Sequence, residues 1–228
     1  MTVTHTWSYE GTELAWLRAA LAPSDDRPGH VVAELVPGGF AAYLRIFHRF
    51  EAADGSGRTR RWRDLAQESG ALFHGELSHH RLRGADGPDG RPLWQPVDGE
   101  PDAGTRQALV RVLAGTTGGR PVFFGYDLAL LVRGADGPAV RSSPLDRLES
   151  VRADMTDSHA YLVGPEFWWP QDRSWVVTSD YDLVSSYIGC SAELAERILA
   201  EPAIEALPVT LRTRVDFSSD HLNRPSEM

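Results

Sequence analysis

The chain has 228 residues, of which 42% are hydrophobic, and its 32 acidic and 23 basic residues give a formal net charge of −9. This composition is typical of a globular protein, and the negative charge disfavours binding to nucleic acids or to anionic membranes. All 23 basic residues are arginine, which excludes Schiff-base chemistry, pyridoxal phosphate attachment and a Walker-type phosphate loop. The single cysteine, Cys190, excludes an intramolecular disulfide.

The sequence contains no apolar run near the ~20 residues that a membrane-spanning helix needs. The first five residues, Met1–His5, lack the basic and apolar regions of a secretory signal. We therefore expect no membrane association and a cytoplasmic location.

The first third of the chain predicts two helices and two strands. Apolar residues at helical spacing indicate a helix over Thr12–Leu21, and a second helix over Trp62–Ser69 that Gly70 ends. Between them, Val31–Val36 and Tyr43–Phe50 have the apolar runs and the alternation that are typical of strands.

The remainder begins with a long loop over Arg83–Asp102, which is dense in Gly, Pro and Asp. Helices are predicted over Thr105–Ala114 and Ala192–Ala200, and Ser191 caps the second of them. Asp-Gly turns predict a hairpin of residues 128–133 with Ala139–Arg141. The predicted strands of this part are Val122–Phe124, Ala129–Val132, Ala160–Val163, Trp175–Ser179 and Leu183–Ile188.

Because strands outnumber helices and turns join most of them, the sequence predicts an α+β fold. We expect one domain over residues 1–216, in which three to four short helices pack around a mainly antiparallel sheet. The polar residues 217–228 are expected to form a frayed tail.

The most metal-like stretch runs from His74 to His80 and includes Glu76. A zincin motif needs two histidines four residues apart with the glutamate next to the first, so this spacing is wrong for it. We expect hydrogen-bonded histidines here, without metal or cofactor. A metal-dependent or hydrolytic enzyme using these side chains remains the alternative.

A second candidate site follows the strand Trp175–Ser179, where Asp180 and Asp182 form an Asp-x-Asp pattern. Such carboxylates can hold a divalent cation, and the pattern resembles the metal-binding motif of nucleotide-sugar glycosyltransferases. No nucleotide-binding βαβ unit precedes it, so a polar turn is the preferred interpretation. Both aspartates are also candidate binding residues.

An aromatic segment supplies the other candidate binding residues: Phe167, Trp168, Trp169 and Asp172. Neighbouring residues of an extended chain point to opposite sides, so we expect one of the two tryptophans at the surface or in a groove. Exposed tryptophans are frequent in binding hot spots.

Two parts of the chain, Val36–His48 with Trp62–Ala66 and Phe167–Trp175 through Tyr187–Gly189, together resemble a family of actinobacterial proteins of unknown activity. That likeness implies no function or site residue. In size, acidity and α+β order the chain also resembles immunity proteins of the SUKH superfamily, which bind and neutralise toxins. The leading hypothesis is therefore a non-enzymatic, acidic module that binds a basic protein as an immunity or regulatory partner.

Overall fold

The computed structural model describes residues 7–23, 30–82, 92–127, 138–155 and 164–223. Its largest element is an eight-stranded sheet in which all neighbouring strands are antiparallel, which confirms the predicted α+β fold. In spatial order the strands are β1 (Trp7–Ser8), β7 (Ala139–Ser143), β6 (Val122–Tyr126), β8 (Phe167–Pro170), β9 (Val176–Ser179), β10 (Ser185–Cys190), β2 (Ala42–Phe47) and β11 (Ala206–Val209).

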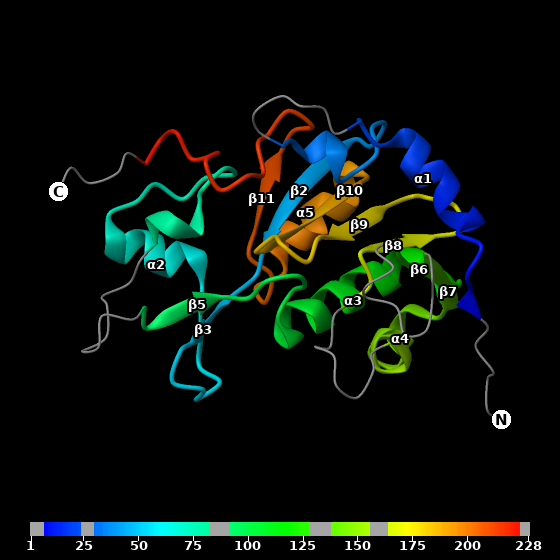
Figure 1. Ribbon diagram of the computed structural model, residues 1–228, viewed down its shortest axis with the longest axis horizontal. Coiled ribbons are helices and arrows are strands. Elements are labelled where there is room, and N and C mark those ends of the chain that lie inside the picture. Colours follow the sequence, from blue (N-terminus) through cyan, green and yellow to red (C-terminus); the bar gives the residue numbers. More distant parts are fainter. Residues whose placement is uncertain (1–6, 24–29, 83–91, 128–137, 156–163, 224–228) are drawn as a thin grey trace.

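Helices cover both faces of this sheet, with α1 on one side of β8 and β9 and with α3 and α4 on the other (Figure 1). The α-helices are α1 (Ala15–Ala20), α2 (Trp62–Ser69), α3 (Ala103–Thr117), α4 (Leu148–Met155) and α5 (Ala192–Ala200). Short 3₁₀ turns are η1 (Thr12–Leu14), η2 (Val32–Glu34), η3 (His79–Arg81) and η5 (Leu145–Arg147).

The two covered faces explain why Trp168 and Trp169 are both buried, with exposed fractions of 0% and 2%. Trp168 lies in the core between the sheet and α3, where its ring meets Phe124 edge-on. Trp169 lies on the other face and stacks on Phe123, with ring centroids 5.5 Å apart. The prediction that one indole would be exposed is wrong, because it assumed a sheet with only one covered face.

A smaller sheet of β4 (Thr59–Arg60), β3 (Phe50–Ala52) and β5 (Trp94–Pro96) packs with α2 at one end of the molecule. The chain leaves the large sheet after Phe47, so the predicted strand Tyr43–Phe50 is divided between the two sheets. Trp62 of α2 fixes this crossing, because its indole N–H donates to the carbonyl of His48 at 2.6 Å.

Local signals predicted most helices well. The bounds of α2 and α5 are the predicted ones, Gly70 ends α2 at φ 66°, and Ser191 accepts the amide of Leu194 at 3.2 Å. Helix α3 is longer than predicted at both ends. Asp102 caps its start and accepts the amide of Thr105, and the left-handed Gly118 follows its last residue, Thr117. The helix predicted over Thr12–Leu21 is present as η1 followed by α1.

Val31–Val36 is not a strand, and this prediction is wrong. The Glu34 carboxylate turns back to accept the amide of Val31 at 3.3 Å, which favours the 3₁₀ turn η2. Val31 pairs only in an isolated bridge with Arg214. The apolar residues of this run instead pack on Tyr187.

Several other elements differ from the predictions. Helix α4 and strands β8 and β11 were not predicted, and β5 forms within the predicted loop over Arg83–Asp102. Strand β7 pairs with β6, and the strands predicted over 129–132 and 160–163 lie outside the described residues.

Residues 217–223 also differ from the predicted frayed tail, because Ser219 and Asp220 are buried with exposed fractions of 2% and 5%. The Asp220 carboxylate accepts a hydrogen bond from His74 at 3.1 Å and two from Asn223. These contacts dock the segment on the loop that precedes η3.

None of the helices in the described part of the chain is long and apolar enough to cross a membrane.

Candidate functional site

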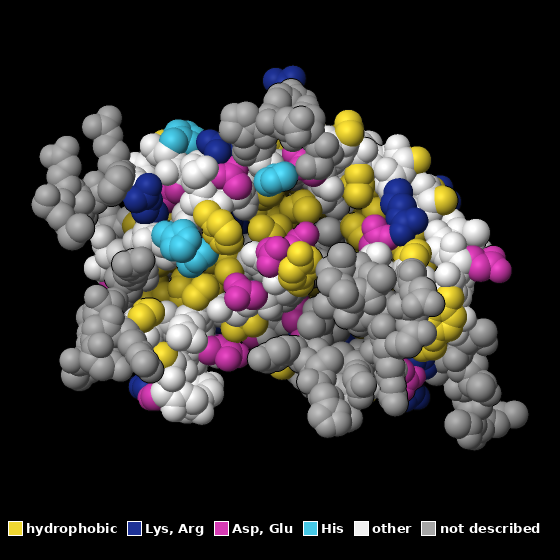
Figure 2. All heavy atoms as spheres, in the orientation of Figure 1, with side chains coloured by type: hydrophobic (Ala, Val, Ile, Leu, Met, Phe, Trp, Pro, Cys, Tyr) yellow, Lys and Arg dark blue, Asp and Glu magenta, His cyan; other side chains and the backbone are white. Residues whose placement is uncertain are grey.

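A cavity of about 430 Å³, here called the outer cavity, opens on the face shown in Figure 2. Its apolar lining comes from Leu21, Ala22, Leu35, Leu183, Val215 and Phe217. Its polar lining comes from His30, Glu34, Asp180, Asp182 and Asp216. In Figure 2 hydrophobic side chains form a hollow near the centre, and acidic and histidine side chains lie around it.

Four segments of the chain build the outer cavity, and backbone hydrogen bonds join three of them. The amide of Ala22, just after α1, donates to the carbonyl of Ala33 at 2.8 Å. The amide of Val32 donates to Thr213, and the amide of Val215 donates to His30 at 2.9 Å. The fourth segment is the turn between β9 and β10, which carries Asp180 and Asp182. Backbone hydrogen bonds therefore fix three of the four cavity walls.

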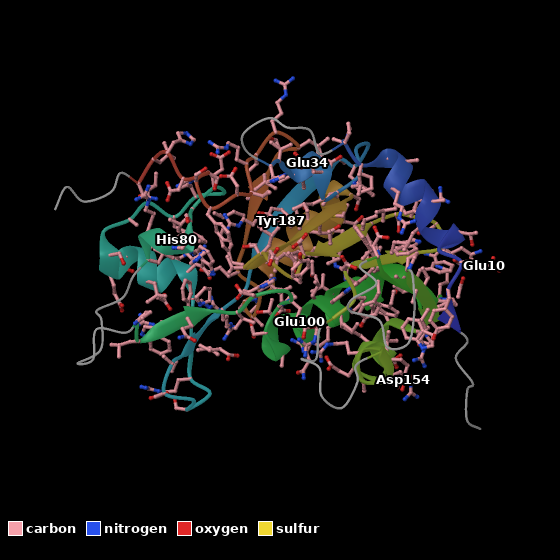
Figure 3. The ribbon with its side chains drawn as sticks, viewed as in Figure 1. Glu10, Glu34, His80, Glu100, Asp154 and Tyr187 are labelled. Atoms are coloured by element: carbon pink, nitrogen blue, oxygen red, sulfur yellow. The ribbon has the colours of Figure 1, made fainter. Side chains whose placement is uncertain are left out.

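Two of the four carboxylates have cationic neighbours. Glu34 on η2 (Figure 3) hydrogen-bonds His30 at 2.8 Å, and this bond raises the pKa of the imidazole. Burial raises the pKa of Asp216, but hydrogen bonds from Ser218 and the charge of Arg214 outweigh this effect and leave the pKa below its usual value.

Asp180 and Asp182, in the turn between β9 and β10, add two further negative charges to the lining. The amide of Asp182 donates to the Asp180 carboxylate at 2.9 Å, in the turn predicted from the sequence. The charge of Asp182 also reaches Asp98: burial and this charge both raise the pKa of Asp98. Four carboxylates thus face one imidazole in the lining, which makes the outer cavity attractive to cations.

A second, much smaller space of about 20 Å³, the inner cavity, shares Leu183, Val215, Asp216 and Phe217 with the outer cavity. Arg45 of β2 reaches it and is 5% exposed. Leu183 and residues 215–217 therefore form a wall common to both cavities. Residues 215–223 are called the C-terminal segment below.

The structure brings only two of the six predicted binding residues to the outer cavity, Asp180 and Asp182. Phe167, Trp168 and Trp169 belong to the core of the sheet and are not available to a partner. Asp172 lies in the turn after β8, where its carboxylate pairs with Arg120 at 2.8 Å. The three aromatic residues of this segment therefore contribute to the hydrophobic core.

The histidine stretch is used in structural contacts. His74 hydrogen-bonds Asp220, and Glu76 accepts the amide of Arg214 at 2.9 Å and pairs with His221 at 3.2 Å. The rings of His79 and His80 lie 3.9 Å apart on η3. Within the described residues, no group of three His, Cys, Asp or Glu side chains is placed to hold a metal ion.

One serine–histidine pair has the geometry of a nucleophile and a base. The hydroxyl of Ser186 lies 2.8 Å from Nε2 of His48, but both residues are completely buried. They line neither the outer nor the inner cavity, so neither cavity gives a substrate access to them. Cys190 is buried, and burial raises the pKa of its thiol to about 11.

The largest other charged cluster joins α3 and α4. Arg106 pairs with Glu149 at 2.7 Å, and Arg152 pairs with Glu100. Arg141 pairs with Asp154 beside them, and Figure 3 labels Glu100 and Asp154. These charges neutralise one another and hold the helices on the sheet.

Sequence reasoning missed His30, Glu34, Leu183, Asp216 and Phe217 as site residues. They carry no motif, and they meet only because η2, the β9–β10 turn and the C-terminal segment come together in the fold. The one available signal was Phe217, a large aromatic residue in a polar segment, which is 57% exposed. A comparison of the chain with known protein families, with curated proteins and with solved structures found no match.

Proposed function

We propose that this protein is a non-enzymatic binding module whose outer cavity receives a cationic side chain of a basic partner protein. The observation that carries the proposal is the combination of an apolar lining with four carboxylates around a cavity of about 430 Å³. An arginine or lysine side chain has the matching chemistry, because its aliphatic stem packs on apolar groups while its charged head binds carboxylates.

The whole molecule supports the same assignment. Its net charge of −9 attracts a basic partner at long range, and the outer cavity gives that partner a specific place to bind. A protein that neutralises or regulates a basic protein must associate with it quickly and must cover a cationic residue. The net charge provides the first property and the outer cavity provides the second. An immunity or regulatory role belongs to this proposal.

Titration of ¹⁵N-labelled protein with N-acetyl-arginine-N-methylamide, followed by NMR, tests the cavity directly. We expect chemical shift changes concentrated at the amides of Leu35, Leu183 and Phe217. The matched ligand is the citrulline analogue, which has nearly the same shape without the charge. Equal shifts with both ligands, or shifts scattered over the surface, would contradict the proposal.

Paired variants separate a local effect from that of net charge. Asp180→Asn with Asp182→Asn should weaken arginine-amide binding about two- to fivefold, the range for removal of exposed ion pairs. Glu193→Gln with Glu196→Gln changes the net charge equally on exposed positions of α5 and should leave the affinity nearly unchanged. Equal weakening in both variants would show that only overall charge matters.

A further inference from the structure

The inner cavity contains a buried cation without an ion-pair partner. Arg45 donates from Nε to the hydroxyl of Ser185 at 2.9 Å and from Nη1 to the carbonyls of Gly75 and Leu77 at 2.9 and 3.0 Å. Its guanidinium carbon lies 4.4 Å from the ring centroid of Phe47. Among the described residues, no carboxylate forms an ion pair with Arg45. No described residue accepts a hydrogen bond from its Nη2 either.

Neutral acceptors and an aromatic ring do not cancel the charge of a guanidinium. Burial lowers the pKa of Arg45, but an arginine side chain stays protonated in proteins. An uncompensated buried charge is costly, and proteins normally pair such charges. The carboxylates near Arg45 have other partners. Glu76 accepts from Arg214 and Asp220 accepts from Asn223, while Asp216, which also lines the inner cavity, pairs with Arg214 at 3.1 Å.

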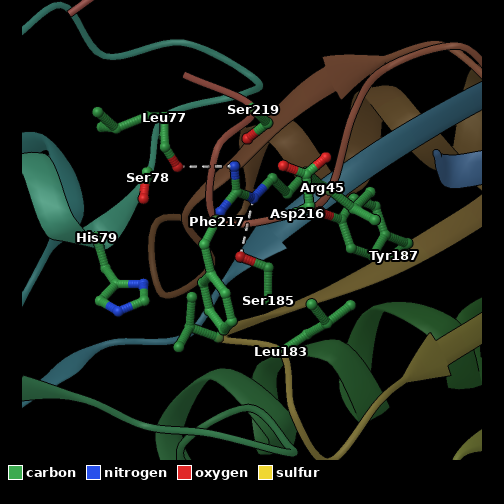
Figure 4. A pocket seen from close by; sticks show the side chains of 12 residues that line it. Arg45, Leu77, Ser78, His79, Leu183, Ser185, Tyr187, Asp216, Phe217 and Ser219 are labelled. Carbon is green, nitrogen blue, oxygen red and sulfur yellow. Dashed lines mark hydrogen bonds between the residues drawn. The ribbon is translucent and has the colours of Figure 1, made fainter. Parts of the chain in front are cut away.

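A second, independent feature lies in the same cavity lining. Ser78 is 6% exposed, and its hydroxyl oxygen is completely buried. This hydroxyl makes no hydrogen bond to any described residue. A buried hydroxyl without a partner is unusual, because such groups are nearly always hydrogen-bonded. In Figure 4 the guanidinium of Arg45 points toward the side of the cavity where Leu77 and Ser78 lie, and the ring of Phe217 lies below them.

We propose that the inner cavity is a binding site for one small monovalent anion of chloride size, held between the guanidinium of Arg45 and the hydroxyl of Ser78. The volume of about 20 Å³ suits a single water-sized group and is too small for a phosphate or a sulfate. The anion neutralises the charge of Arg45 and accepts a hydrogen bond from the Ser78 hydroxyl. This proposal does not rest on the cation proposed for the outer cavity, although the two cavities share one wall.

Thermal unfolding in sodium chloride, compared with sodium gluconate at the same ionic strength, tests the proposal. A ligand that binds only the folded state raises the melting temperature in a saturable way, by about 3–6 °C at ten times its Kd for a chain of this length. Chloride-35 NMR provides a direct measurement, because exchange with a protein site broadens the chloride line. Coinciding chloride and gluconate curves would overturn the proposal.

The variant Ser78→Ala keeps Arg45 and removes one anion contact, so we expect the Kd for chloride to rise at least threefold. Ser219→Ala is the matched control: Ser219 also lines the inner cavity, but its hydroxyl donates to the carbonyl of Glu76 at 3.0 Å. The control should bind chloride as the wild type does. An unchanged Kd in Ser78→Ala, or an equal rise in both variants, would overturn the assignment.

Discussion

His48 lies just after β2 and is completely buried, with one hydrogen-bond partner on each ring nitrogen. Nδ1 lies 3.0 Å from the carbonyl of Val97, which can only accept, so this nitrogen carries the proton of the neutral ring. Nε2 then accepts from the hydroxyl of Ser186, which in turn accepts from Ser179. Burial lowers the pKa of His48 to about 4, so the ring is neutral at pH 7.

This lowered pKa predicts a loss of stability in acid. Between pH 6.5 and about 4 the unfolded chain binds a proton at His48 that the folded protein does not bind. The free energy of unfolding therefore decreases as the pH is lowered through this range. The loss is on the order of 3 kcal/mol across this window. Urea unfolding at several pH values should show a shallower acid slope for His48→Gln than for the wild type.

His30 supplies a control of opposite sign. Its hydrogen bond to Glu34 raises the pKa of the imidazole, so His30 contributes stability below pH 6.5 that is lost as the pH rises through its folded pKa. His30→Gln should therefore lower stability mainly below pH 6.5 and should not make the acid slope shallower. An acid slope of His48→Gln equal to that of the wild type would contradict the neutral, buried state of His48.

Gly125 of β6 makes room for Trp169. A Cβ atom at this position would lie 2.9 Å from Cδ2 of Leu14 and 3.0 Å from Cζ3 of Trp169. Gly125→Ala should therefore overpack this core and lower the free energy of unfolding by about 1–3 kcal/mol. Urea denaturation measures the change.

The matched control for this substitution is Gly38→Ala. Its Cβ would meet only Leu211, at 3.7 Å, which is ordinary van der Waals contact. The control should be neutral or stabilising by less than about 1 kcal/mol. Equal effects of the two substitutions would show that the close approach of Trp169 does not constrain position 125.

At the scale of elements, the C-terminal segment is held by one buried carboxylate. The side chain of Asp220 is 1% exposed and also accepts the amides of Ser78 and Leu222. Asp220→Ala leaves the buried amide of Ser78 and the part-buried amide of Leu222 without this acceptor and should cost about 2–3 kcal/mol in thermal or urea unfolding. Asp172→Ala, in an exposed turn, should cost under about 1 kcal/mol. Similar costs for both would indicate a weakly attached segment.

Elements with complete local signals could be predicted from the sequence. Helices α2 and α5 combine apolar spacing with a defined end, the left-handed Gly70 in one and the Ser191 cap in the other. Strand β8 could not be predicted, because its run of four buried residues lacks the alternation of a strand with one wet face. Val31–Val36 has the apolar content of a strand, but the local bond to Glu34 and the packing on Tyr187 determine its conformation.

The candidate site was less predictable than the elements. Asp180 and Asp182 could be selected because they follow a strand and share a turn. The side chains that meet them across the outer cavity, Glu34 and Phe217, come from opposite ends of the chain. Their proximity depends on tertiary hydrogen bonds such as Val215 N–H to His30 O, which no local pattern encodes.

At the scale of the whole molecule, the net charge of −9 predicts salt-dependent association with a cationic probe. The on-rate of a labelled nona-arginine peptide, measured by stopped flow, should fall at least tenfold between about 20 and 500 mM salt, because screening shortens the range of the attraction. A nona-citrulline peptide is the uncharged control. An on-rate independent of salt would contradict electrostatic steering.

The same measurement separates steering from binding in the cavity. Asp180→Asn with Asp182→Asn and Glu193→Gln with Glu196→Gln remove equal charge, so both pairs should lower the on-rate similarly. Only the first pair lies in the outer cavity and should raise the off-rate. Off-rates that rise equally in both would place the contact elsewhere.

The shared wall of the two cavities has a consequence for biosynthesis. Residues 215–217 complete both cavities, whereas every other lining segment of the outer cavity precedes them by the length of β10, α5 and β11. Translation adds about 5–20 residues per second, and N-terminal parts of a chain fold first. A nascent chain that ends before residue 215 therefore lacks the site even when the strands of the large sheet have emerged. On the proposed function, the outer cavity can receive a cationic side chain only after residues 215–217 have emerged from the ribosome.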